Sequence, residues 1–99
     1  MIVVSGTFNF PAGSADAVKA AMATCVAATL QEEGCITYAF YPDMTQPDVY
    51  RVFEEWETMD HLKAHGASEH LGVYREALKA AGIIDRSVKI YQVGKIIPI

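Results

Sequence analysis

Three residues in the middle of the chain carry side chains that could perform chemistry on a small molecule. Glu54 and Trp56 stand two residues apart in a run of β-branched and aromatic residues, so they fall on one face of a predicted strand. His65 follows in a predicted helix. Its imidazole, with an ordinary pKa of about 6.5, is the side chain best suited to take a proton near neutral pH. The sequence therefore predicts an enclosed pocket in which His65 is the candidate general base.

Each of these residues also has a purely structural explanation. His65 can be a helix histidine that hydrogen-bonds a strand carboxylate such as Glu54, and Trp56 can be an anchor of the core. In a pocket, the indole would stack on a planar substrate, and a buried Glu54 would need a partner, which could be His65. Tyr50 shares the predicted strand face of Glu54 and Trp56, and Tyr38 lies on the preceding strand. We expect Trp56, Glu54, Tyr50 and Tyr38 to bind the substrate.

A metal site is the weaker interpretation of the histidines. His61, His65 and Glu69 follow one another at a spacing of four, which would stack three ligands on one face of an unbroken helix. Gly66 and Ser68 stand between them and are expected to break that helix. We therefore predict no metal ligands in this segment.

The periodicity of the chain predicts the elements that position these residues. The strands are expected at residues 1–10, 35–41, 49–57 and 88–97, with one helix from a Ser14 cap to Gly34, a short helix from 58 or 60 to 65, and a longer helix from Ser68 to Gly82. The order is βαββαβ, and helical crossovers can return over the same face of an antiparallel sheet. The predicted fold class is α+β: one ferredoxin-like domain over residues 1–99, with a four-stranded antiparallel sheet and two helices on one face.

The face of the sheet that the helices leave open predicts a homodimer. Val3, Phe53 and Tyr91 each alternate with an apolar side chain on the other face of their strand, so both faces carry apolar side chains. An open antiparallel sheet in water is normally polar on one side, and a chain of 99 residues has a small core of its own. We expect two copies to pack sheet against sheet, with the apolar segment Ile96–Ile99 extending across the partner.

The charge and the apolar runs exclude other classes of partner. The net charge is −4 and the lysines are scattered, so the sequence predicts no basic surface that would bind a nucleic acid. No apolar run approaches the roughly 18 residues that a membrane span requires. Cys25 and Cys35 lack the spacing of a metal site or a disulfide framework, and the chain opens on Ile2 without a charged leader. These features predict a cytoplasmic protein with reduced thiols.

An ordered set of short motifs extends this interpretation to a family. The set comprises Glu33-Gly34-Cys35, Tyr38, the strand Phe53–Glu57, and then Leu62, His65, Ser68 and His70. In this order the motifs resemble the antibiotic biosynthesis monooxygenase family over nearly the whole chain. The resemblance implies a dimeric α+β barrel with one pocket per subunit, and a histidine at position 65. It also implies oxygenation of quinol- or polyketide-type aromatics to quinones by dioxygen, without metal, flavin or haem.

Two other functions stay open at this point. An isomerase of a small phosphorylated metabolite would need cations around a phosphate, and Arg51, Lys63, Arg75 and Arg86 are available. A non-catalytic dimeric binding or stress-response protein would hold a hydrophobe in the same pocket without turning it over. The coincidence of His65 with Glu54 and Trp56 favours catalysis over both.

Overall fold

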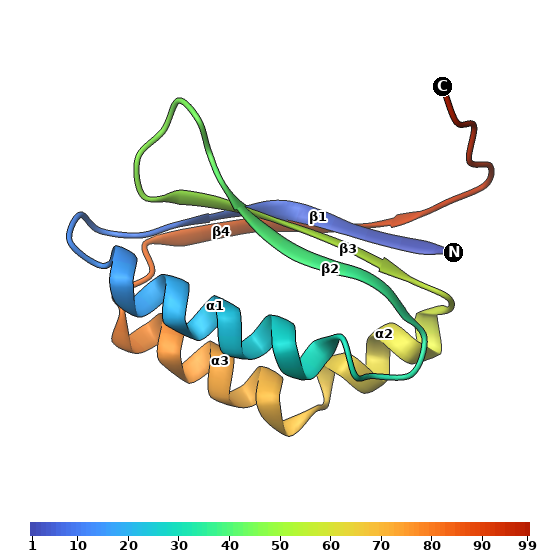
Figure 1. Ribbon diagram of the computed structural model, residues 1–99, viewed down its shortest axis with the longest axis horizontal. Coiled ribbons are helices and arrows are strands. Elements are labelled where there is room, and N and C mark those ends of the chain that lie inside the picture. The colour runs from blue at the N-terminus through green and yellow to red at the C-terminus, as the bar shows by residue number, and fades with distance from the viewer.

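A computed structural model describes all residues from 1 to 99, and its elements follow the predicted order (Figure 1). The elements are β1 (Ile2–Asn9), α1 (Ala15–Thr29), β2 (Cys35–Pro42), β3 (Val49–Trp56), α2 (Met59–Gly66), α3 (Glu69–Ala80) and β4 (Asp85–Gln92). The four strands form one antiparallel sheet in the order β2-β3-β1-β4. The α+β ferredoxin-like arrangement is confirmed.

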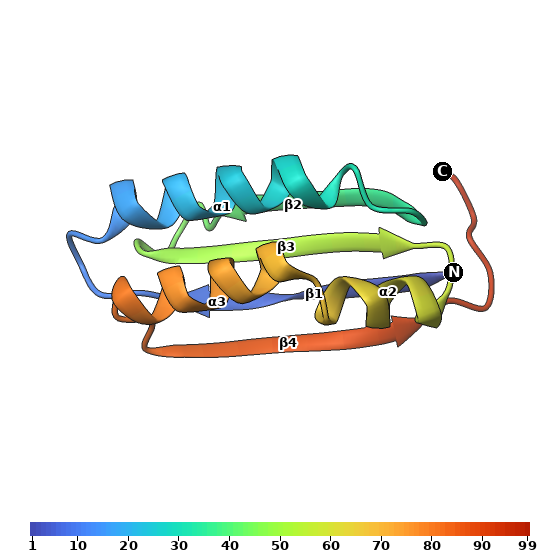
Figure 2. The same cartoon turned by 90° about the horizontal axis from the view of Figure 1, so that it is seen from below.

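All three helices cover the same face of the sheet (Figure 1). Seen from the helical side, α1 lies toward β2, whereas α2 and α3 lie toward β1 and β4 (Figure 2). Between helices and sheet lies the core, to which β1 contributes Ile2, Val4 and Phe8, and β3 contributes Val52 and Trp56. These residues alternate along their strands, as the period of two requires. The opposite face of the sheet has no helix on it.

The break between α2 and α3 follows the predicted capping residues. Thr58 caps α2 by accepting a hydrogen bond from the backbone N–H of His61, and Ser68 caps α3 by accepting one from Leu71. Ser14 occupies the N-cap of α1, but its hydroxyl donates to the carbonyl of Pro11 at 2.7 Å and makes no capping bond. None of these helices is long and apolar enough to cross a membrane.

Two predicted boundaries were wrong, each for a reason visible in the backbone. The first helix stops at Thr29 rather than at Gly34, because the chain tightens into a turn in which the N–H of Glu32 bonds to the carbonyl of Thr29. The last strand is Asp85–Gln92 rather than 88–97. It pairs with every residue of β1, from Asn9 opposite Asp85 to Ile2 opposite Gln92, and one further backbone bond joins the N–H of Val93 to the carbonyl of Met1 at 3.0 Å.

Candidate active site

A cavity of ≈ 420 Å³ lies between the sheet and the pair α2 and α3. Apolar side chains make most of its wall, among them Val4, Phe8 and Val52 from the sheet and Leu71 and Leu78 from α3. Its polar lining includes Tyr38, Glu54, His65 and Tyr74. A volume of this size, apolar with a few polar groups, suits a small aromatic molecule.

His65 is buried at the C-terminal end of α2, with 3% of its surface exposed. Its ring stacks at a tilt on Trp56, with 4.9 Å between centroids, and meets the ring of Tyr38 edge-on at 5.2 Å. Burial lowers the pKa of His65, and the neighbouring carboxylate of Glu32 opposes this effect in part. The imidazole is therefore neutral at neutral pH, which is the form that accepts a proton.

The partner of His65 is Glu32, and the expectation that Glu54 fills this role was wrong. The Oε2 atom of Glu32 lies 2.6 Å from Nδ1 of His65 and 2.8 Å from Nε2 of His70. An ionised carboxylate only accepts hydrogen bonds, so both of these ring nitrogens carry the proton. The free lone pair of His65 is then on Nε2. Glu54 is engaged elsewhere, because the indole N–H of Trp56 donates to its Oε1 at 3.0 Å.

The Nε2 atom of His65 makes no hydrogen bond within the protein. Only one fully buried side-chain nitrogen or oxygen of the structure lacks a hydrogen-bond partner, and that atom is the hydroxyl oxygen of Tyr74. Since Nε2 also lacks a partner and is not among the fully buried atoms, it keeps accessible surface. His65 lines the cavity, so this surface belongs to the cavity. The arrangement presents a lone pair, fixed in place by Glu32, to any molecule bound there.

The tight turn after α1 carries Glu32 to the two histidines. Gly34 adopts the left-handed conformation with φ = +78°, and a Cβ atom there would come within 2.2 Å of the His61 ring. The carbonyl of Gly34 also accepts a hydrogen bond from the N–H of Glu57 at 2.9 Å. Glycine thus lets the turn pack directly against α2. The motif Glu33-Gly34-Cys35 marks this turn in the sequence, but sequence reasoning missed Glu32 because the helix was expected to continue through it.

Glu54 is the second titratable group of the cavity. It is 7% exposed, and burial raises its pKa to about 7, an effect that the hydrogen bond from Trp56 opposes. The negative charge of Glu32 raises the pKa further, whereas the positive charge of Arg86 lowers it. Near neutral pH the side chain therefore exists in both forms, and it can accept or donate a proton.

The three other residues predicted to bind the substrate lie in three different environments. Tyr38 lines the cavity, but its hydroxyl lies 3.5 Å from Sγ of Cys25, and burial raises its pKa so that it stays protonated. Trp56 is fully buried behind His65, so its indole has no free face for a substrate. Tyr50 packs against Phe10 at 5.9 Å and lines a different hollow between α1 and β2. The structure brings His65, Glu54 and Tyr38 together and separates Tyr50 from them.

Glu32, His65 and His70 are also the group of side chains best placed to hold a metal ion. Their ligand atoms lie within 4.8 Å of one another. The separations of 2.6 and 2.8 Å are hydrogen-bond lengths, and donors about 2.0–2.2 Å from a tetrahedral ion lie more than 3 Å apart. A cation would therefore displace the Glu32 oxygen from its present position. The triplet His61, His65 and Glu69 does not assemble, since Nδ1 of His61 bonds to the Thr58 hydroxyl at 2.9 Å.

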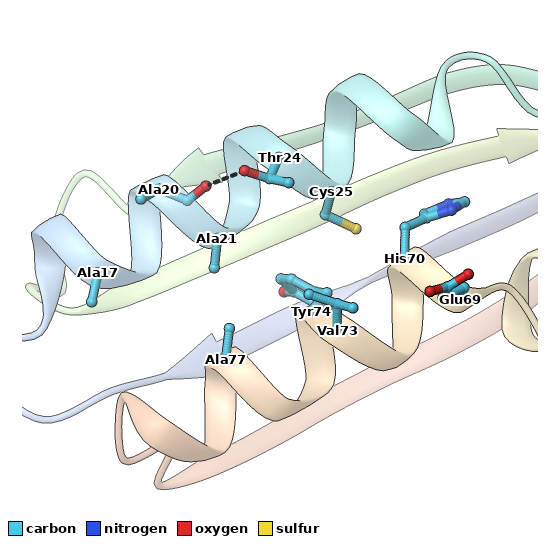
Figure 3. Close-up of a pocket in the computed structure, with 10 residues that line it drawn as sticks. All are labelled: Ala17, Ala20, Ala21, Thr24, Cys25, Glu69, His70, Val73, Tyr74 and Ala77. Carbon is cyan, nitrogen blue, oxygen red and sulfur yellow. Dashed lines mark hydrogen bonds between the residues drawn. The ribbon is translucent and has the colours of Figure 1, made fainter.

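A groove of ≈ 620 Å³ between α1 and α3 lies on the other side of this cluster. Figure 3 shows its walls of small residues, mainly alanines, with His70 pointing from α3 toward α1. The side-chain exposure rises from 4% at His65 to 17% at Glu32 and 26% at His70. The three side chains therefore form a hydrogen-bonded connection from the buried imidazole to the surface.

Comparisons with known proteins agree with this architecture. The sequence profile of the family described as antibiotic biosynthesis monooxygenase matches residues 1–77. The "Probable quinol monooxygenase YgiN" of Escherichia coli (strain K12) is 34% identical over 86 residues, which cover 79% of this chain and 82% of that protein. The crystal structure of a candidate antibiotic biosynthesis monooxygenase from Deinococcus radiodurans superposes with a TM-score of 0.94 at 27% identity, covering 100% of this chain and 98% of the other.

A second crystal structure shares the fold at lower identity. A candidate monooxygenase of the same description from Caulobacter crescentus CB15 has a TM-score of 0.88 at 22% identity, covering 95% of this chain and 90% of the other. The profile match spans most of the chain, from β1 into α3, and includes Glu32, Glu54, His65 and His70. This chain belongs to the antibiotic biosynthesis monooxygenase family.

Proposed function

We propose that this protein is a cofactor-independent monooxygenase that oxidises a quinol- or polyketide-type aromatic with dioxygen to a quinone. The observation that carries the proposal is the neutral, buried His65, held through Nδ1 by Glu32 while Nε2 opens on a largely apolar cavity. An electron-rich phenol needs a base and an apolar enclosure in order to react with dioxygen, and this cavity has both.

The reaction can be written on these residues. Nε2 of His65 takes the proton of the phenol, and the phenolate gives one electron to dioxygen. The two radicals join to form a C–O bond at a ring carbon that carries hydrogen, and the peroxide takes up a proton. The O–O bond then breaks, and the hydrogen of that carbon leaves with the departing hydroxide as water. The ring keeps one oxygen atom as the new carbonyl.

The connection to His70 supplies a route for the proton. When Nε2 of His65 takes up a proton, the Nδ1 proton can pass to Glu32, which already accepts that hydrogen bond at 2.6 Å. Glu32 also contacts His70, which reaches the solvent-facing groove between α1 and α3. Glu32 is thus a positioning residue that sets the tautomer of His65 and links it to the surface.

We further propose that the protein acts as a homodimer. The sheet face opposite the helices carries no other element (Figure 1). Tyr91 pairs with Val3 on this face and keeps 49% of its surface exposed. In the C-terminal segment, Ile96 and Ile97 are 63% and 70% exposed. Packing of two such faces, with the segment Ile96–Ile99 laid across the partner, would remove this apolar area from water. The free thiols of Cys25 and Cys35 support a reducing compartment such as the cytoplasm.

Oxygen uptake tests the proposal. Metal-stripped protein, without added flavin or haem, is given a panel of anthrones and hydroquinones, and the uptake is corrected for autoxidation. We expect quinone formation in the wild type and a loss of about 10²-fold or more in kcat for His65→Ala. His61→Ala is the matched control, because that histidine lies outside the cavity lining. Ligand binding without oxygen uptake would instead support a binding protein.

A second candidate function, an isomerase of a small phosphorylated metabolite, is favoured by one observation. Lys63, Arg75 and Arg86 line the same cavity as His65. A sugar phosphate that binds while anthrones and hydroquinones leave oxygen uptake unchanged would support this alternative.

A further inference from the structure

Three cations surround the cavity from three different elements. Lys63 comes from α2, Arg75 from α3 and Arg86 from β4, and all three line the cavity while their side chains remain exposed. The whole chain has eight lysines and arginines against twelve acidic residues. An acidic protein thus places three of its few cations around one small cavity.

None of the three cations forms an ion pair or a side-chain hydrogen bond within the protein. The only ion pair of the structure that uses a lysine or arginine joins Lys79 to Glu76. The only hydrogen bonds from such side chains are those of Arg51 and Lys79. The three side chains are therefore free to contact a ligand, and the guanidinium groups suit an oxyanion.

The interior of the cavity complements this positive rim. Phe8 contributes a flat apolar wall, and the Arg86 guanidinium lies over its ring at 5.9 Å from the centroid. Glu54 is the only carboxyl group that lines the cavity, and it has a neutral form near pH 7. Tyr74 adds a buried hydroxyl without a partner to the cavity wall. An aromatic ring therefore suits the interior, and a negative group suits the rim.

We propose that the ligand of this cavity is an aromatic molecule that carries an anionic substituent, with the ring beside His65 and the anion held by Lys63, Arg75 and Arg86. The inference deepens the proposed monooxygenase function and rests on it for the reaction. Because the guanidinium groups can bind a carboxylate or a phosphate in two-point contact, the shared chemistry is an oxyanion on an aromatic ring.

The test compares two quinones of similar shape, one of which carries a negative charge. Anthraquinone-2-carboxylate and 2-hydroxymethylanthraquinone are titrated by calorimetry, and quenching of Trp56, the only tryptophan and a neighbour of His65, gives a second readout. Quinones are used because they bind without consuming oxygen. We expect the carboxylate to bind at least about ten-fold more tightly at low salt, and the advantage to shrink as salt screens the charges.

Substitution of the cations identifies the source of the preference. Arg86→Gln and Arg75→Gln should each weaken binding of the carboxylate about three-fold to ten-fold and leave binding of the neutral quinone unchanged. Lys89→Gln is the matched control, because Lys89 is exposed on β4 but does not line the cavity. Equal affinities for the two quinones, or equal effects of Arg86→Gln on both, would overturn the proposal.

The outcomes separate this inference from the proposed function. Oxygen uptake on neutral hydroquinones, without any preference for the carboxylate, would leave the monooxygenase proposal standing and refute the anionic ligand. Tight binding of ribose 5-phosphate, with no binding of either quinone, would refute the aromatic part. A preference for the carboxylate that Arg75→Gln and Arg86→Gln abolish, without oxygen uptake on any substrate, would support the anionic ligand and refute the reaction.

Discussion

Replacing Glu54 by glutamine should change how the stability of the protein depends on pH. Burial raises the pKa of Glu54 from 4.5 to about 7 in the folded state. The folded protein therefore holds a proton that the unfolded chain has already released, and this contribution to stability is lost as pH rises from about 4.5 through 7. A shift of about 2.5 pH units corresponds to about 3.4 kcal/mol over the whole range, of which about 2.5 kcal/mol falls between pH 5 and pH 8.

Glutamine cannot ionise and keeps an oxygen that can accept the hydrogen bond from Trp56. The free energy of unfolding of Glu54→Gln, relative to wild type, should thus rise by about 2.5 kcal/mol between pH 5 and pH 8. The other titratable groups are present in both proteins, so their contributions cancel in the difference.

Urea unfolding followed by circular dichroism, at four pH values and one fixed protein concentration, measures this difference. Glu57→Gln is the matched control, because Glu57 is exposed immediately after β3 and should show no comparable trend. A difference between Glu54→Gln and wild type that stays constant within about 0.5 kcal/mol from pH 5 to pH 8 would refute the burial argument.

Three further predictions concern the turn, the cavity wall and the histidine. Gly34→Ala should destabilise the protein by more than about 1–2 kcal/mol, the cost of placing an alanine in the left-handed conformation, because its Cβ would also clash with His61. Gly66→Ala is the control, because the space around Gly66 is open, and it should not destabilise the protein to this extent. Thermal unfolding of the two variants measures the difference. Tyr74→Phe should leave stability unchanged or raise it by about 1 kcal/mol, because the buried hydroxyl has no partner, and a loss of stability in urea unfolding would show that the hydroxyl is satisfied. Glu32→Gln should lower the pKa of His65 below its wild-type value in an NMR titration, because the carboxylate raises it, and an unchanged pKa would contradict the assigned contact.

The strand alternation and the capping residues were sufficient to predict most of the fold. Val4 and Val52 fall on the buried face because successive side chains of a strand alternate. Thr58 and Ser68 are typical capping residues, and they predict the starts of α2 and α3 on either side of the break. The end of the last strand could not be read in this way. It pairs with the eight residues of β1 and adds one bond from Val93 to Met1, and a pairing partner is not a local property.

The candidate site was predictable only in part, for a similar reason. His65 and Glu54 could be found from residue type and strand face, but the contact of Glu32 with His65 joins residues 33 positions apart and depends on how one turn packs on α2. Tyr50 shares a strand face with Trp56, yet six residues of extended chain separate them by about 20 Å. Sharing a face places two residues in the same layer but not in the same cavity, because Tyr50 lines a hollow beside α1, whereas Trp56 packs against His65 of α2.

The central claim is that this chain inserts one atom of dioxygen into an aromatic ring without a cofactor. Turnover of an anthrone under ¹⁸O₂ by metal-stripped protein, with rapid mass spectrometry of the product, tests it most directly. We expect one labelled oxygen per quinone, the second labelled atom in water, and loss of the labelled product in His65→Ala. An unlabelled quinone accompanied by hydrogen peroxide, or equal labelling with His65→Ala, would contradict it.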